Sequence, residues 1–163
     1  EINYSSDIHR EAFRLAKNYG IPVTIHAGEA AGADNIRKAI YELDARRIGH
    51  GVRLIDDPAL MKHVKDSGIV IESCLTSNLQ TQVVDRIESH PFAGYFRSGI
   101  RACLNTDDRS VCNTTLTDEY ALAMQSFGLT EKDITKTVEY SIAGSFALPA
   151  LKEKLLGRLK NLN

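Results

Sequence analysis

Four short apolar segments of this sequence each end in side chains that can exchange a proton or hold a metal ion. They are Val23-Thr24-Ile25-His26-Ala27-Gly28-Glu29, Arg47-Ile48-Gly49-His50-Gly51, Ile69-Val70-Ile71-Glu72-Ser73-Cys74 and Ala102-Cys103-Leu104-Asn105-Thr106-Asp107-Asp108. A helix-like stretch follows each segment. Because consecutive strand–helix units form a parallel sheet, and βα-barrel enzymes build their sites at the carboxyl ends of the strands, the pattern predicts one catalytic edge.

The elements that must position these residues are strands at 23–26, 47–50, 69–72 and 101–105. We expect helices at 7–19, with Ser6 or Asp7 as N-cap, at 35–43, with Asp34 as cap, from Asp57-Pro58 to Gly68, and from Pro91 to Gly99. Three more are expected at 117–127, 130–146 with Thr130 as cap, and 150–159. The predicted fold is α/β: four parallel strands with flanking helices and extra C-terminal helices.

In these four segments the sequence resembles the adenosine deaminase family of metal-dependent amidohydrolases. The matching motifs are His26-Ala27-Gly28-Glu29, Gly49-His50-Gly51, Glu72-Ser73-Cys74-Leu75-Thr76-Ser77-Asn78 and Asn105-Thr106-Asp107-Asp108, in the family's order. The resemblance implies the second half of a TIM (β/α)8 barrel, with residues 1–163 as a single lobe. A complete barrel needs about 250 residues, so we interpret the chain of 163 as a fragment, a processed chain or one of two pieces.

The resemblance also implies roles for individual residues. His26 and Asp107 become zinc ligands, Glu29 the general acid that protonates purine N1, and His50 a group that acts on the metal-bound water as proton acceptor or as an orienting residue. Asp108 is implied to bind purine N7. A proton donor must stay protonated near neutral pH, so we expect Glu29 in a buried site that raises its pKa.

Plainer interpretations stand beside these roles. His26 and His50 can be structural histidines, Glu29 can cap the helix near Asp34, and an Asp-Asp pair is usually a turn or a helix cap. Arg109 departs from the family, in which many members have proline after the two aspartates, and this leaves the loop and the position of Asp108 open.

Other polar residues are predicted to be structural or superficial. We assign turn and cap roles to Glu72, Ser73, Thr76, Ser77 and Asn78. His9, His63 and His90 lie away from the strand ends and are predicted at the surface.

The composition is that of an ordinary globular protein, with 43% hydrophobic and 25% charged residues and a formal net charge of −1. This balance argues against non-specific binding to nucleic acid or acidic membranes. The sequence holds three cysteines without a C-x-x-C pair, which favours a reducing cytoplasm over a disulfide framework. Cytidine-type deaminases use H-x-E with P-C-x-x-C, a pattern that is absent here.

The implied reaction is hydrolytic deamination of a 6-aminopurine, most readily adenosine to inosine and ammonia, with zinc as cofactor. The family takes two further metal ligands from a His-x-His pair on its first strand, which this sequence lacks. We therefore expect the chain alone to be inactive and to pair with an N-terminal half-barrel or with itself. A non-catalytic binding or assembly lobe is the main alternative. An amidohydrolase acting on adenine or an N6-substituted purine is the other.

Overall fold

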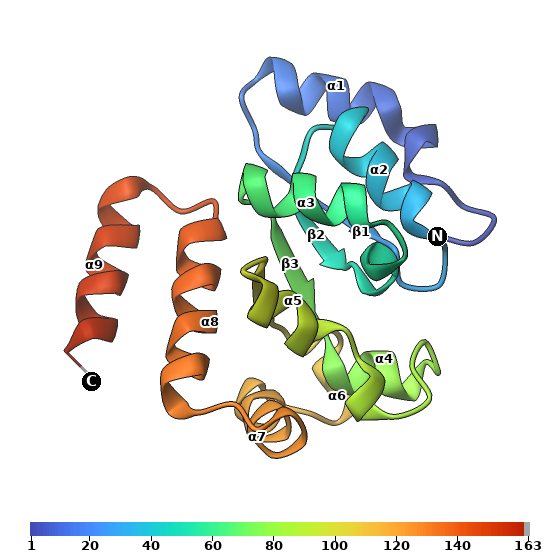
Figure 1. Ribbon diagram of the computed structural model, residues 1–163. Coiled ribbons are helices and arrows are strands. Elements are labelled where there is room, and N and C mark those ends of the chain that lie inside the picture. Colours follow the sequence, from blue (N-terminus) through green and yellow to red (C-terminus); the bar gives the residue numbers. More distant parts are fainter. Residues whose placement is uncertain (162–163) are drawn as a thin grey trace.

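The computed structural model describes residues 1–161, in which four parallel strands form one sheet in the order β1-β2-β3-β4 (Figure 1). The strands are β1 (Val23–Ala27), β2 (Ala45–His50), β3 (Val70–Ser73) and β4 (Arg101–Leu104). Helices α2 (Ala33–Tyr41), α3 (Pro58–Ser67) and α5 (Phe92–Ser98) connect them. Because the strands are parallel and adjacent in chain order, their carboxyl ends share one edge, as the predicted half-barrel requires.

Further helices precede and follow the sheet. They are the 3-10 helix η1 (Ser6–His9), α1 (Arg10–Asn18), η2 (Val52–Asp56), α4 (Leu75–Gln80), η3 (Ile87–Ser89), α6 (Arg109–Cys112), α7 (Leu116–Phe127), α8 (Glu131–Gly144) and α9 (Pro149–Lys160). Figure 1 shows α8 and α9 as a neighbouring pair beside the sheet, where α8 contacts β4. Among the described residues, no helix has the length and apolar character needed to cross a bilayer.

Local sequence explains most helix ends. Asp57 caps α3 by accepting the Leu60 N–H at 2.9 Å, Pro58 occupies its first turn, and Gly68 ends it at φ 67°. Thr130 caps α8 through a reciprocal capping box with Asp133. These three predicted signals are confirmed.

Two predicted helix starts are wrong. The segment 7–19 is divided into η1 and α1, and Ser5, which precedes η1, makes no side-chain cap. Helix α2 begins at Ala33 after Gly32, so Asp34 lies inside the first turn, where its charge favours the positive end of the helix dipole.

The core lies between the sheet and α2, α3 and α5. Ile25 lies opposite Ile48, and Ile48 opposite Ile71, so three isoleucines form one row across the sheet. All three are buried, and they pack in one cluster with Ile36 of α2 and Phe92 of α5. Burial of each such side chain contributes roughly 1.5–3 kcal/mol, which makes this layer the main scaffold of the half-barrel.

The face that a closed barrel would turn inward is polar. Glu72 accepts a hydrogen bond from Thr24 at 2.7 Å and forms an ion pair with Arg47. Arg47 also donates to the Gly144 carbonyl at 3.2 Å and lies over the Phe146 ring. These contacts tie the polar layer of β1, β2 and β3 to the end of α8.

The apolar strand residues Val23, Ile25, Ile48, Val70 and Leu104 would suggest from sequence an apolar inner face that half a barrel leaves open, but the structure does not have one. Ile25, Ile48 and Leu104 belong to the buried helix-side core, which Val23 contacts from its edge. Val70 is buried too, with Gly144 packed against it. The sequence interpretation mixed the two faces because apolar residues occupy both at the starts of the strands.

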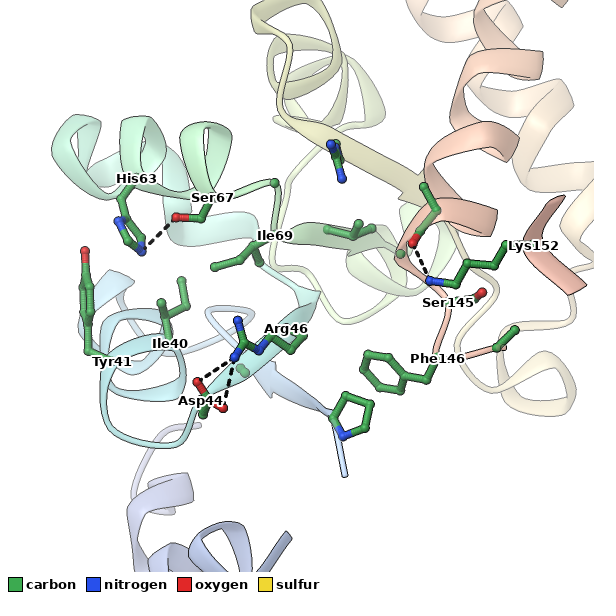
Figure 2. Close-up of a pocket in the computed structure, with 18 residues that line it drawn as sticks. Ile40, Tyr41, Asp44, Arg46, His63, Ser67, Ile69, Ser145, Phe146 and Lys152 are labelled. Carbon is green, nitrogen blue, oxygen red and sulfur yellow. Dashed lines mark hydrogen bonds and ion pairs between the residues drawn. The ribbon is translucent and has the colours of Figure 1, made fainter. Parts of the chain in front are cut away.

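A cavity of about 650 Å³ lies at the amino ends of the strands, opposite the catalytic edge expected from the sequence. Figure 2 shows Phe146 and Lys152 on one side of it and Tyr41 and His63 on the other. In βα-barrels this end serves stability and the carboxyl end carries the chemistry. We therefore expect the functional site at the carboxyl ends of the strands, opposite this cavity.

One glycine next to that site is required by its surroundings. Gly28 has φ 71°, and a Cβ there would lie 2.3 Å from Ile36 Cδ1. We expect Gly28→Ala to lower the free energy of unfolding by about 2 kcal/mol or more, because it combines a left-handed conformation with overpacking. Urea unfolding measures the change. Gly20→Ala is the matched control, since Gly20 has φ 65° with nothing within 4 Å; equal losses for both variants would contradict the overpacking argument.

Candidate active site

The predicted site residues come together at the carboxyl edge of the sheet. His26 lies near the end of β1, His50 ends β2, and Asp107 follows β4. His50 and Asp107 both have left-handed backbones, with φ 66° and 57°. Such conformations cost about 1–3 kcal/mol each in non-glycine residues and concentrate at functional sites. They turn the chain sharply where the strands end.

His26 is the most accessible of the histidines in the site. Its side chain is 50% exposed, and Nε2 lies 3.1 Å from Glu29 Oε2 and 3.5 Å from Glu1 Oε1. The hydrogen bond to Glu29 raises the pKa of His26. The His26 and His50 rings are 4.3 Å apart between centroids, so two imidazoles face one small volume.

Glu29 lies between the two histidines and the short helix α4. Its Oε1 accepts from Asn78 Nδ2 at 2.8 Å and from Thr81 Oγ1 at 3.3 Å, while Oε2 faces His26. The hydrogen bond from His26 lowers the pKa of Glu29, and the nearby His50 lowers it further. The expectation of a raised pKa is wrong in this structure, because hydrogen bonds to the charged form outweigh burial.

His50 is buried and held from both sides of its ring. Nδ1 lies 3.0 Å from Asn78 Nδ2, and Nε2 lies 3.7 Å from Asp107 Oδ2. Burial lowers the pKa of His50. A neutral imidazole at this position donates a hydrogen bond from one ring nitrogen and accepts one at the other.

The two adjacent aspartates have different surroundings. Asp107 Oδ2 accepts from Ser77 Oγ at 2.7 Å, which orients the carboxylate toward His50. Asp108 Oδ1 instead accepts the backbone N–H groups of Ser110 and Val111 at 3.0 and 2.9 Å and caps α6. The predicted N7 contact of Asp108 stays a prediction.

The donor set suits a divalent metal ion. His26, Glu29 and His50 offer ligand atoms that lie within 4.8 Å of one another, and so do His50, Cys74 and Asp107. A cavity of about 250 Å³ is lined by His26, His50, Cys74 and Asp107. Imidazole nitrogens and carboxylate oxygens are common zinc ligands, and these atoms are close enough together to bind one ion. The residues present therefore fit zinc. Burial raises the pKa of Cys74 far above its usual range, which disfavours the thiolate.

Several residues that hold the site side chains by hydrogen bonds are not predicted from the sequence. Ser77 and Asn78 were assigned turn or cap roles, yet they contact Asp107, Glu29 and His50. His90, predicted at the surface, is 3% exposed and bonds to Asn78 Oδ1 at 3.1 Å. His90 precedes Pro91, which was the available signal that it lies in a fixed turn and not on a free helix face.

Glu1 was also missed. Its carboxylate accepts the N–H groups of Glu29, Ala30 and Ala31 at 2.6 to 3.0 Å, which fixes the loop after β1. No spacing in the sequence connects Glu1 with this loop, because the contact is made across the fold.

Parallel strands with histidine and carboxylate side chains gathered at their carboxyl edge define half of a βα-barrel. The model of the adenosine deaminase family matches residues 1–162, so this chain belongs to the adenosine deaminase family.

Individual relatives agree with this membership. The chain is 40% identical over 160 residues to an adenosine deaminase of Serratia proteamaculans (strain 568), covering 98% of this chain and 48% of the relative. It resembles the apo N6-methyl-AMP deaminase of Arabidopsis thaliana, with 30% identity, a TM-score of 0.82, and coverage of 93% and 44%. It also resembles an amidohydrolase of Burkholderia ambifaria solved with bound Zn, with 25% identity, a TM-score of 0.88, and coverage of 96% and 44%. The chain thus spans about half the length of the relatives it matches.

Proposed function

We propose that the complete protein containing this chain catalyses hydrolytic deamination of a 6-aminopurine, converting adenosine and water to inosine and ammonia. The observation that supports this most directly is the meeting of Glu29, His26 and His50, whose side-chain donor atoms lie within 4.8 Å of one another. The relative of Serratia proteamaculans, named adenosine deaminase, supports the choice of substrate.

Zinc is the proposed cofactor, held from this half of the barrel by His26 and Asp107. When bound, zinc lowers the pKa of water from about 15.7 to about 7 and so supplies a nucleophile at neutral pH. A catalytic zinc site commonly uses three protein ligands, so we assign the remaining ones to the other half of the barrel. The bound Zn of the Burkholderia ambifaria amidohydrolase supports the choice of metal.

The residues of this chain are assigned separate tasks in the reaction. Glu29 donates its proton to purine N1 as a C6–O bond forms, which relieves the negative charge that develops on the ring. Asp108 binds N7 and fixes the plane of the purine. His50 contacts the attacking water, whose oxygen adds to C6. One proton of that water passes to the C6 amino group, the C6–N bond breaks and ammonia leaves, and the other proton restores the proton of Glu29. General acid–base help of this kind typically contributes roughly 10²–10⁴-fold to the rate.

Glu29 must carry a proton for this role. The contact that lowers its pKa most is the hydrogen bond from His26 Nε2. A cation held by the same nitrogen would replace that bond, because a ring nitrogen that donates an N–H has no lone pair left for a metal ion. Metal binding at His26 and proton donation by Glu29 are therefore compatible uses of the two side chains.

The proposed partner of this chain is the other half of the barrel, and the proposed location is the cytoplasm. In the described sheet, β1 and β4 each have one unpaired edge. Large apolar side chains of the N-terminal segment are exposed, including Ile8 at 60%, Leu15 at 57% and Tyr19 at 75%. An unpaired strand edge and exposed apolar side chains each favour a covering element.

A substrate panel on the complete protein tests the proposed activity. We expect adenosine to give the highest kcat/KM, with adenine and N6-methyl-AMP well below it, because the Serratia proteamaculans relative, at 40% identity, is named adenosine deaminase. Release of ammonia or methylamine measures all three substrates. A preference for N6-methyl-AMP would move the assignment to N6-substituted purines, as the name of the Arabidopsis thaliana neighbour suggests. No release from any purine by the zinc-loaded protein would contradict the proposal and favour a non-catalytic lobe.

A further inference from the structure

We propose that Asn78 is the positioning residue of this site. Its side-chain amide holds Glu29 and His50 in a fixed position relative to each other and is itself anchored by His90. This inference rests on the proposed function, since it assigns the orientation of the two groups that would act on the substrate. Asn78 lies on α4, is fully buried, and contacts Glu29, His50 and His90.

The orientation of the amide is fixed from both ends. The Phe92 backbone N–H can only donate, and it donates to His90 Nδ1 at 3.1 Å. The proton of a neutral His90 is then on Nε2, which lies 3.1 Å from Asn78 Oδ1. Burial lowers the pKa of His90 to about 4, which keeps the ring neutral.

The other end agrees with this orientation. Asn78 Nδ2 can only donate, and it donates at 2.8 Å to Glu29 Oε1, which accepts whether or not Oε2 carries a proton. Nδ2 carries two hydrogens, so the second is directed to His50 Nδ1 at 3.0 Å. The amide therefore donates to Glu29 and to His50 and accepts from His90. A rotation that exchanged Nδ2 and Oδ1 would break all three hydrogen bonds.

Two consequences follow for the reacting groups. His50 Nδ1 accepts a hydrogen bond, so the N–H of the neutral ring is on Nε2, the nitrogen that faces Asp107. Glu29 Oε1 is occupied as an acceptor from Asn78, which leaves Oε2, on the His26 side, as the oxygen to carry a proton. Asn78 thus directs both protons toward the side where the metal-binding donors gather.

The helix that carries Asn78 is held in place from elsewhere in the fold. Glu119 of α7 is fully buried, and its Oε2 accepts the N–H groups of Leu75 and Thr76 at 3.0 and 3.4 Å. This carboxylate caps the first turn of α4, a helix of six residues whose own N-cap residue makes no side-chain hydrogen bond. Asn78 therefore belongs to a rigid support, which a positioning role requires.

The test uses Asn78→Asp in the complete protein, because this change keeps the shape and the acceptor for His90 but removes both donors. We expect kcat to fall about 10- to 100-fold while zinc content and KM stay nearly unchanged. A loss of this size is typical when a residue that orients a ligand or catalytic group loses its hydrogen bonds. Asn35→Asp, the same change on α2 outside the site, is the matched control and should leave kcat unchanged. Wild-type kcat in Asn78→Asp, with only the melting temperature lowered, would reduce Asn78 to a structural residue and overturn the inference.

A pair of His90 variants keeps the inference testable if Asn78→Asp fails to fold. His90→Gln retains an N–H donor near the position of Nε2 and should keep kcat close to wild type. His90→Phe retains volume but removes the donor, and should lower kcat as Asn78→Asp does. Equal kcat values in these two variants would contradict the anchoring role.

A readout without turnover separates this inference from the proposed function. In the ¹⁵N spectrum of the histidine-labelled complete protein, assigned with single His→Gln variants, His50 should carry its proton on Nε2. Asn78→Asp should move the proton to Nδ1, because the new carboxylate can only accept. If the wild type places the proton on Nδ1, the inference is wrong whether or not the protein deaminates purines; if the spectra agree but no purine reacts, only the proposed function fails.

Discussion

Glu29→Gln is expected to leave zinc content unchanged and to lower kcat for adenosine by at least about 10²-fold, because the amide cannot give up the proton that N1 needs. Asn78 and Thr81 can still donate to the side-chain oxygen that replaces Oε1, so the local structure is retained. KM should change little. Metal analysis beside initial rates on the complete protein measures both quantities.

Asp107→Ala is the complementary variant and should lose zinc together with activity, since it removes a ligand. Asp108→Asn is its matched control: this neighbouring aspartate caps α6 and should keep the metal while KM rises. Full zinc content in Asp107→Ala would contradict the ligand assignment. Unchanged kcat in Glu29→Gln would remove Glu29 as the acid.

The second large effect concerns the 163-residue chain by itself. Its kcat is expected to fall by several orders of magnitude below the ~10 s⁻¹ that is typical of enzymes, because a site with His26 and Asp107 alone lacks ligands for a stable metal ion. Addition of the N-terminal half-barrel should restore turnover. Inosine formation with added zinc is the measurement.

The same chain should not stay monomeric. The free edges of β1 and β4 and the exposed apolar residues near α1 favour association with the other half-barrel or with a second copy. Size-exclusion chromatography with light scattering tests this. A monodisperse monomer that excludes a hydrophobic dye, or rapid turnover by the chain alone, would contradict the expectation.

Local sequence signals were enough to predict the strands and several helix ends. Each of the four strands was predicted within about two residues of its observed bounds, because apolar runs bounded by glycine or proline are strong local signals. Asp57-Pro58, Gly68 and Thr130 marked helix ends correctly for the same reason. The placement of His26, Glu29, His50 and Asp107 at one edge followed from the parallel order of the strands.

The parts that could not be predicted depend on contacts between distant segments. Helix α4 was missed because its polar sequence resembles a turn and its N–H groups are satisfied by Glu119, which is 44 residues away from Leu75. His90 and Asn78 were assigned outside the site because their burial results from the packing of α4 against the loop before α5. The lowered pKa of Glu29 likewise arises from a tertiary contact, the hydrogen bond with His26.

The central claim is that this half of the barrel supplies His26 and Asp107 to one catalytic zinc ion. Anomalous diffraction at the zinc edge, from crystals of the complete protein, tests it most directly. The account predicts a peak about 2.0–2.2 Å from an imidazole nitrogen of His26 and from a carboxylate oxygen of Asp107. A zinc peak on other residues, with the side chains of His26 and Asp107 free of metal, would contradict it.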